Sequence, residues 1–227
     1  MESHLETDLD VLKQRLLTMA NHAEKAVTEA LQALDQRDDD LALQVKQSDR
    51  VINRFEIEID DLVIQQLIKA PLATDLRTVT ASVKISHNLE RIGDEAKKIA
   101  KHAIELSGQP PIDIKLDIPC MASLTLEMLK LSLDAFSHRD PAAARALIPR
   151  DKEVDVLNKQ VHQMLSQHMA KHPNAIQRCL DWMAVSKSLE RIADHATNIA
   201  EDVVYLCEAR HIRHTGVKRG MPSLATA

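Results

Sequence analysis

Glycine and aromatic residues are scarce in this sequence of 227 residues. There are 4 glycines, and Phe, Trp and Tyr together make up 2% of the chain. β-Sheets draw on aromatic residues, whereas the abundant Ala, Leu, Lys, Glu and Gln favour helices. Apolar residues account for 44% of the sequence, which is enough to bury a core. The composition therefore argues against a sheet-rich protein and predicts an all-α, globular fold.

An excess of positive charge, a paired cysteine pattern and a long apolar run are also absent. The formal net charge is −5, with 29 Lys and Arg against 34 Asp and Glu, so nucleic acid is not an expected partner. Cys120, Cys179 and Cys207 are far apart and form no CxxC pair, which predicts reduced, semi-buried thiols. The sequence has no run of eighteen apolar residues and begins without a basic and apolar leader. We expect a soluble, cytoplasmic protein.

Apolar residues recur at every third or fourth position along most of the chain, which is typical of amphipathic helices. Leu5, Leu9, Leu12 and Leu16 begin this rhythm in the first segment. Asp39 or Asp40 can cap the second helix and Pro71 closes it, and Pro149 should kink the fifth. The six helices are expected at about residues 5–34, 40–70, 79–106, 119–137, 142–171 and 174–210.

The second half of the sequence repeats the first. Residues 89–100 match residues 189–200 at 8 of 12 positions, and the Arg-Asp turn at 37–38 returns at 139–140. Ser107 to Pro111 is the one stretch typical of a linker. The chain therefore divides into a three-helix unit at 1–108, a linker at 109–118, a second three-helix unit at 119–210 and a flexible basic tail at 211–227.

Each half also carries two pairs of oxygen-bearing side chains at helical spacing. Glu90 and Asp94 are four residues apart, which places them on one helix face about 6 Å apart along the axis, where their charges repel. The same spacing recurs in the second half and on the middle helix of each unit. The eight candidate ligands are Asp49, Asn53, Glu90, Asp94, Asp151, Asp155, Glu190 and Asp194.

A metal ion is one way to stabilise such clusters. If the middle and last helices of a unit pack side by side, the facing carboxylates need a cation, and oxygen ligands suit Mg²⁺, Mn²⁺ or iron better than zinc. Possible additional ligands are Glu56, His195 and Asn198. The first half has Glu95 and Lys98 at the positions of the last two, so the two sites should not be equivalent.

An ordinary charged surface is the alternative. Arg91, Lys97 and Lys98 could neutralise Glu90 and Asp94 through contacts with residues three or four positions away. The recurrence of the pairs inside the best-matched segment of the duplication favours the metal interpretation. The sequence shows no Gly-rich phosphate loop, no GxSxG motif and no Glu-x-x-His pair of the kind found in di-iron bundles, and we assign no catalytic residue.

These motifs together resemble those of the PhoU family, the phosphate-specific transport system accessory proteins of bacteria. The resemblance rests on the Leu-Glu-Arg-Ile segments at 89–92 and 189–192, on Asp75-Leu76-Arg77 and on the segment from Asp49 to Asn53, and it covers residues 1 to about 209. It implies two three-helix bundles, each with a multinuclear metal site carried by the E(D)xxxD motif. It also implies negative control of the phosphate-starvation response.

The partners implied by the resemblance are the ATPase subunit of a phosphate importer and a phosphate-sensing histidine kinase. The protein would then lie at the cytoplasmic face of the membrane, held there by its partners, and a homodimer is expected. Two other classes of function stay open from the residues alone. One is a carboxylate-bridged metalloenzyme built in a helical bundle, and the other is a scaffold that binds no metal.

Overall fold

The computed structural model describes residues 2–67 and 73–212, and within these ranges every regular element is helical. The predicted all-α fold with two three-helix units is confirmed. The first unit consists of α1 (Glu2–Gln36), α2 (Asp39–Leu67) and α3 (Ala73–Ser107). The second consists of α4 (Ile118–His138), a middle helix divided into α5 (Pro141–Leu147) and α6 (Asp151–Lys171), and α7 (Ile176–Glu208).

The same turn opens the second helix of each unit. Arg37 and Arg139 adopt left-handed backbone conformations, with φ of 55° and 51°, and so end the preceding helices. The aspartate that follows caps the next helix: Asp38 accepts from the backbone N–H of residue 41 at 2.9 Å, and Asp140 accepts from two backbone N–H groups at 2.9 and 3.0 Å. The expected cap at Asp39 or Asp40 was therefore wrong by one residue, because α1 ends at the left-handed Arg37.

Pro149 interrupts the predicted fifth helix more sharply than a kink. A 3₁₀ turn at Ile148–Arg150 separates α5 from α6, because proline cannot donate the backbone hydrogen bond that a continuous helix requires. A second 3₁₀ turn at Pro173–Ala175 precedes α7. Pro71 and the predicted flexible tail beyond Ile212 lie outside the described residues.

None of the three cysteines is semi-buried as expected. Cys179 is buried, whereas Cys120 and Cys207 are exposed, and within the described ranges all three are free. No helix in the described part of the chain is long and apolar enough to cross a membrane.

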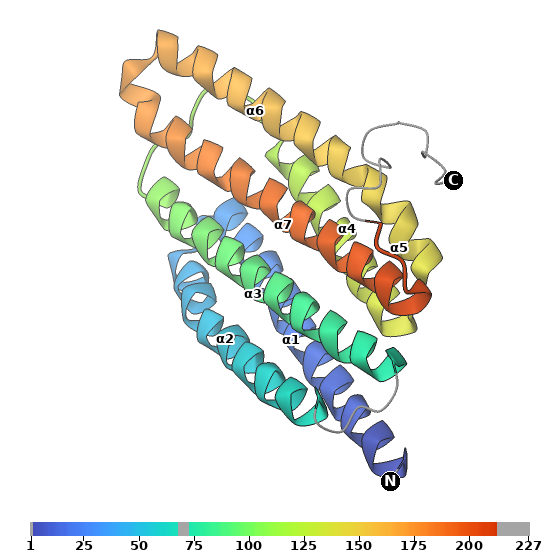
Figure 1. The fold of residues 1–227 in the computed structure, drawn as a ribbon. Helices are drawn as coiled ribbons and strands as arrows, with labels where there is room; N and C mark the ends of the chain where they lie inside the picture. Colours follow the sequence, from blue (N-terminus) through green and yellow to red (C-terminus); the bar gives the residue numbers. More distant parts are fainter. Residues whose placement is uncertain (1, 68–72, 213–227) are drawn as a thin grey trace, which may run out of the picture.

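The two units share one core. α3 and α7 run antiparallel side by side in the centre of the molecule, with α1 and α2 against α3 and with α4 and α6 against α7 (Figure 1). Leu89 and Ile92 of α3 and their counterparts Leu189 and Ile192 of α7 are all fully buried in a single apolar cluster. We call the contact between α3 and α7 the seam. It joins the units along most of the length of two long helices.

Candidate metal centre

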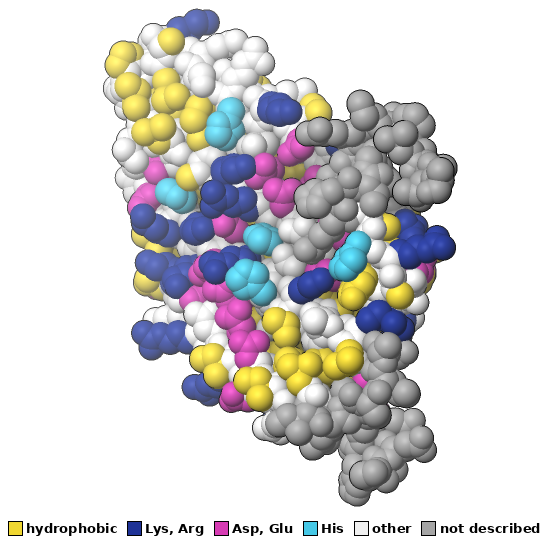
Figure 2. All heavy atoms as spheres, viewed as in Figure 1, with side chains coloured by type: hydrophobic (Ala, Val, Ile, Leu, Met, Phe, Trp, Pro, Cys, Tyr) yellow, Lys and Arg dark blue, Asp and Glu magenta, His cyan; other side chains and the backbone are white. Residues whose placement is uncertain are grey.

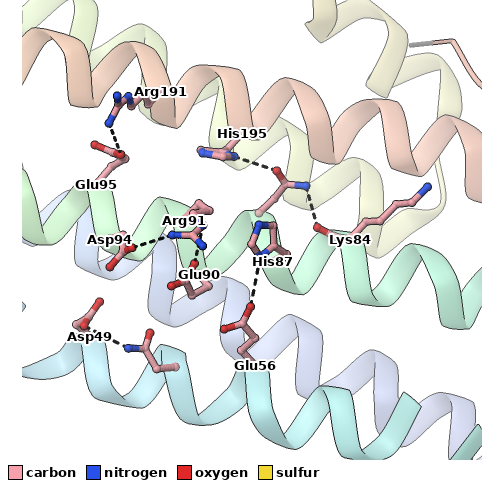
Figure 3. A network of polar contacts seen from close by, with 12 residues as sticks. Asp49, Glu56, Lys84, His87, Glu90, Arg91, Asp94, Glu95, Arg191 and His195 are labelled. Atoms are coloured by element: carbon pink, nitrogen blue, oxygen red, sulfur yellow. Dashed lines mark hydrogen bonds and ion pairs between the residues drawn. The ribbon is translucent and has the colours of Figure 1, made fainter. Parts of the chain in front are cut away.

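The middle and last helices of the first unit bring its four candidate ligands together. α2 and α3 are antiparallel neighbours, and Asp49 of α2 faces Glu90 and Asp94 of α3 between the two helices (Figure 3). Asn53 Nδ2 donates to Asp49 Oδ2 at 3.5 Å. We call these four residues the first acidic face. Figure 2 shows acidic side chains gathered over α2 and α3, with lysines, arginines and histidines among them.

Three oxygen atoms of the first acidic face are buried and lack a hydrogen-bond donor. They are Asp49 Oδ1, Asn53 Oδ1 and Glu90 Oε2. Glu90 Oε2 lies 3.2 Å from Arg91 Nε, close enough for an ion pair, although their geometry makes no hydrogen bond. Buried acceptors without donors are costly, and all three are ligand types that hard cations prefer. The donor set therefore fits an oxygen-liganded cation.

Burial and like charges raise the pKa of Glu90 above its ordinary value. Burial has the largest effect, the neighbouring Asp94 carboxylate adds to it, and Arg91 opposes it. Glu56 contributes a further increase from α2. A carboxyl crowded in this way gains from a nearby cation, since the positive charge favours its ionised form.

Lys97 supplies one cation from within the chain. Its Nζ donates to Asp49 Oδ2 at 2.7 Å, and this hydrogen bond is the main reason that the pKa of Lys97 is raised. Asp49 is only 4% exposed, whereas Lys97 is 43% exposed. The charged-surface alternative assigned Lys97 to the carboxylates of its own helix, but the side chain crosses to Asp49 of α2. Its position seven residues after Glu90, on the same helix stripe, was the available signal.

The other two basic residues behave partly as the charged-surface alternative predicts. Arg91 pairs with Glu90 at 3.2 Å and with Asp94 at 3.3 Å, from a side chain that is 48% exposed. Lys98 pairs with Glu95 at 2.8 Å and so does not serve the acidic face. Exposed pairs of this kind are weak, so Arg91 leaves the face short of positive charge.

Glu56 joins the site with a histidine that the sequence interpretation did not select. His87 Nδ1 lies 3.5 Å from Glu56 Oε1, and each of Glu56, His87 and Glu90 offers one ligand atom within 4.8 Å of the others. His87 is three residues before Glu90, so the HxxE spacing was the signal for it. Glu56, which the sequence predicted as a possible additional ligand, thus lies beside Glu90.

The second unit has the same helix register, with its acidic groups at the equivalent positions. Ser186 Oγ of α7 donates to Asn158 Oδ1 of α6 at 2.8 Å. Because the two helices are antiparallel, this contact sets Asp155 level with Glu190 and Asp151 level with Asp194. All four are half-buried. We call them the second acidic face.

Three observations separate the second acidic face from the first. Lys187 of the same helix holds Glu190 at 2.6 Å. No three His, Cys, Asp or Glu residues of this face bring ligand atoms within 4.8 Å, as far as the described residues show. Thr197 takes the position of Lys97, is fully buried, and its Oγ1 has no hydrogen-bond partner. Asn198, the next residue, is half-buried. The two faces are therefore chemically different.

His195 lies on the other side of α7, toward the first unit. Its Nδ1 is 2.9 Å from Asn88 Oδ1 of α3, across the seam (Figure 3). The equivalent residue of the first unit, Glu95, also faces the seam, where Ser188 and Arg191 donate to it at 2.8 and 3.2 Å. His195, predicted as a possible additional ligand, thus contributes to the seam between the units.

Two tandem three-helix units, fused along their last helices and carrying an oxygen-rich face between the middle and last helix, define a duplicated helical-bundle protein. A family model described as "PhoU domain" matches this chain twice, at residues 16–103 and 118–203. The chain belongs to the PhoU family.

Curated relatives and solved structures agree with this assignment. A "phosphate-specific transport system accessory protein PhoU homolog" of Pseudomonas aeruginosa is 38% identical over 93% of this chain and 88% of its own length. A homolog with the same description from Clostridium acetobutylicum is 34% identical over 91% of this chain and 95% of its own. The crystal structure of PhoU from P. aeruginosa superposes with a TM-score of 0.88, at 37% identity, and covers 90% of this chain and 99% of its own.

A more distant structure shows the same fold. The phosphate transport system regulatory protein PhoU from Streptococcus pneumoniae superposes with a TM-score of 0.84 at 26% identity, over 92% of this chain and 99% of its own.

Proposed function

We propose that this chain is a non-catalytic, metal-binding regulator of phosphate uptake and of the signalling linked to it. The names of its relatives support the first part, because they describe accessory and regulatory proteins of a phosphate transport system. In this proposal the chain couples the ATPase subunit of a phosphate importer to a phosphate-sensing histidine kinase and represses the phosphate-starvation response. It acts in the cytoplasm and reaches the membrane through these partners.

The buried oxygens of the first acidic face carry the metal part of the proposal. Asp49 Oδ1, Asn53 Oδ1 and Glu90 Oε2 accept no hydrogen bond, and Asp94 and Glu56 add negative charge to the same place. These residues would hold Mg²⁺, Mn²⁺ or iron. A bound cation would supply positive charge between α2 and α3 and so fix one helix against the other. The partner then recognises that fixed surface.

The second acidic face is proposed as a separate site of different strength. Asp151, Asp155, Glu190 and Asp194 have no lysine at the position of Lys97, since Thr197 stands there. The lysine of this face, Lys187, pairs with Glu190 of its own helix at 2.6 Å, whereas in the first face Lys97 Nζ crosses to one oxygen of Asp49 on the neighbouring helix. We expect the second face to bind more cations and the first to bind fewer.

Metal content and partner binding are the direct test. The full-length protein is purified without an affinity tag and analysed for bound elements, before and after chelation, beside Asp49→Asn and Asp194→Asn variants. Binding to the importer ATPase subunit is measured on the same samples. We expect bound metal, loss of part of it in each variant, and weaker partner binding after chelation. Partner binding and thermal stability that are both unchanged by chelation would overturn the link between metal and signalling.

A genetic experiment tests the regulatory role separately. In a strain lacking this protein, phosphate-regulated genes should stay active in high phosphate. Genes that remain repressed would contradict the proposal. If the metal-loaded protein hydrolyses phosphate esters with turnover, and Asp94→Ala abolishes this activity, the chain is a metalloenzyme instead.

The proposed homodimer has a surface that can be examined. Leu43, Ile57 and Ile64 lie on one stripe of α2 and are 45%, 64% and 59% exposed. Light scattering of the native protein and of an Ile57→Lys, Ile64→Lys variant measures the oligomeric state. A dimer that becomes a monomer in the variant supports the proposal, and a native protein that is monomeric at all concentrations contradicts it.

A further inference from the structure

We propose a further metal site at the linker end of the seam, formed by His102 and Glu105 of α3 and Asp181 of α7. The site would take a first-row transition-metal dication such as Zn²⁺ or Mn²⁺ and would clamp the two units together. It is independent of the two acidic faces and of the proposed regulatory function.

The three side chains already converge on one point. His102 Nδ1 lies 2.9 Å from Glu105 Oε2 and 3.2 Å from Asp181 Oδ1. Each of the three residues offers a ligand atom within 4.8 Å of the other two. His102 and Glu105 are three positions apart on one helix face, and Asp181 reaches them from the neighbouring helix. The site thus draws its ligands from both units.

Asp181 is the part of this cluster that ordinary hydrogen bonding does not explain. Its side chain is 2% exposed, and its Oδ2 is buried without a hydrogen-bond partner. Its Oδ1 accepts from Gln177 Nε2 at 3.2 Å. Burial raises the pKa of Asp181, and the Glu105 carboxylate raises it further. A buried carboxylate with an unused oxygen beside a second carboxylate is stabilised by a bound cation.

The distances suit the edges of a metal coordination sphere. Metal–ligand bonds of about 2.0–2.2 Å, at angles between octahedral and tetrahedral, separate neighbouring ligand atoms by about 2.8–3.6 Å. The observed separations of 2.9 and 3.2 Å fall in this range. Binding therefore needs only a small movement of side chains that already point at each other.

The ligand set differs from that of the first acidic face. A ring nitrogen with two carboxylates suits Zn²⁺, Mn²⁺ or Fe²⁺, whereas the all-oxygen set of Asp49, Asn53 and Glu90 suits harder cations. The competing group is Lys101, whose Nζ lies 3.6 Å from Glu105 Oε1, but Lys101 is 61% exposed and the pair is weak. Glu105 Oε2 stays directed at His102.

The single tryptophan of the chain gives a direct readout. Trp182 follows Asp181 in α7 and is half-buried. A bound Co²⁺ ion, used as a probe for the Zn²⁺ site, quenches tryptophan fluorescence at short range. The nearest residue of the first acidic face, Asp94, is eight residues from His102 along α3, and the nearest residue of the second on α7, Glu190, is eight residues from Trp182, about 12 Å along the helix in each case. Quenching of Trp182 therefore reports on the seam site in preference to the first acidic face.

The experiment uses full-length, chelator-treated protein titrated with Co²⁺ by fluorescence and with Zn²⁺ by calorimetry. We expect saturable quenching in the native protein and at least a tenfold loss of Zn²⁺ affinity at one site in His102→Gln and Asp181→Asn. Both substitutions keep the side-chain length and a hydrogen-bonding group. Zn²⁺ should also raise the melting temperature of the native protein and not of these variants.

Two controls separate this site from other effects. Asp49→Asn removes a ligand of the first acidic face and should leave the quenching unchanged, so failure of the proposed function would not remove the seam site. Lys84 Nζ lies 3.9 Å from Asp202 Oδ1 at the opposite end of the seam. Lys84→Ala removes this contact and should also leave the quenching unchanged. Native protein that shows no saturable quenching, or equal Zn²⁺ binding in His102→Gln, would overturn the proposal.

Discussion

At the scale of single residues, one lysine, Lys97, partly neutralises the negative charge of the first acidic face. Asp49 is 4% exposed and accepts from Lys97 at 2.7 Å, while its other carboxylate oxygen has no donor. Carboxylates that crowd together need cations. A lysine within the chain and a dissolved metal ion are two sources of the same charge, so they should partly replace each other.

Lys97→Thr tests this exchange by giving the first unit the residue of the second. Without metal the variant should lose about 1–2 kcal/mol of stability, since the partner of a buried carboxylate is removed, although the exposure of Lys97 keeps the loss below that of a fully buried pair. The melting temperature in chelator should fall by about 2–8 °C. Added Mn²⁺ should restore most of it.

Lys25→Thr is the matched control for that substitution. Lys25 forms an exposed pair with Glu29 at 3.7 Å on α1, so its loss should change the melting temperature little and independently of Mn²⁺. If Mn²⁺ does not restore the melting temperature of Lys97→Thr, lysine and metal are not interchangeable at the first acidic face.

Glu90 predicts a pH dependence with a definite sign. Its pKa is raised in the folded protein, chiefly by burial and then by Asp94, so the folded state holds the proton more tightly than the unfolded chain does. Ionised Glu90 therefore weakens the metal-free fold above this raised pKa, and stability recovers as pH falls through it. Glu90→Gln should be up to about 1 kcal/mol more stable than the native protein at pH 7 in chelator.

Denaturant unfolding across pH measures the effect of Glu90→Gln. The advantage of the variant should disappear as pH falls toward 4, where native Glu90 is itself protonated. The variant should also bind metal more weakly. A variant that is less stable at pH 7 would mean that the lost pair with Arg91, 3.2 Å long in the native protein, outweighs the relief of repulsion.

At the scale of helices, Gly93 of α3 packs tightly against Ile52 of α2. A Cβ at this position would lie 2.8 Å from Ile52 Cδ1, the end of a flexible side chain. The equivalent residue of the second unit is Ala193, which is fully buried. The first unit thus lacks a Cβ at the level of its acidic face, and Ile52 packs into the space.

A double-mutant cycle tests this packing. Ala in place of Gly favours a helix by about 0.5–1 kcal/mol, but Gly93→Ala must displace Ile52, so the single change should be nearly neutral. Ile52→Val removes Cδ1 and alone should cost about 0.5–1.5 kcal/mol. In the valine background Gly93→Ala should stabilise by about 0.5–1 kcal/mol.

Denaturant unfolding of the four proteins in this cycle gives the coupling energy. Ala193→Gly in the second unit is the reverse control, and it should destabilise by about 1 kcal/mol. Independent effects of the two first-unit changes would show that Ile52 does not limit the approach of the helices.

Helices and their acidic pairs could be predicted from sequence because both follow local periodicity. The 3.6-residue rhythm placed all six helical segments, and spacing by four put Glu90 and Asp94 on one face. The partner of Lys97 could not be predicted, since a long side chain can reach its own helix or the next. The cap at Asp38 depended on the left-handed Arg37, which residue type alone does not fix.

At the scale of the whole molecule, the seam was the feature that the sequence did not reveal. Repeats show which residues are equivalent, but the pairing of α3 with α7 is between repeats and leaves no periodic signal of its own. His195 illustrates the consequence. It follows Asp194 directly in the sequence, but its side chain lies on the side of α7 that packs against α3, where it meets Asn88.

The seam buries polar groups whose charge states depend on pH. Burial would raise the pKa of Glu95, but hydrogen bonds from Lys98, Ser188 and Arg191 outweigh it and hold the pKa below its ordinary value. Burial lowers the pKa of His195, with Glu95 opposing and His87, Arg91 and Arg191 adding to the decrease. The seam is therefore built for an ionised Glu95 and a neutral His195.

Acid should weaken the seam in two steps, first by protonating His195 and then by protonating Glu95. A histidine with a lowered pKa contributes stability that is present above its ordinary range and is lost as pH falls from about 7 to about 5. A carboxyl with a lowered pKa loses its contribution only below its ordinary range, under about pH 4. Because the units share one core, the whole molecule should unfold in a single cooperative transition. Each protonation step should lower the free energy of that unfolding.

His195→Gln separates the first step from the second. Glutamine can still hydrogen bond with Asn88 but does not titrate, so the denaturation midpoint of the variant should stay flat between pH 7 and about 5, where that of the native protein falls. His138 is an exposed histidine at the end of α4. The control variant His138→Gln should therefore keep the native dependence of the denaturation midpoint on pH. The midpoints come from denaturant unfolding in chelator, so that metal release does not add to the slope. Equal slopes in His195→Gln and the native protein would place the acid sensitivity elsewhere, and two separate transitions would mean that the units unfold independently despite the seam.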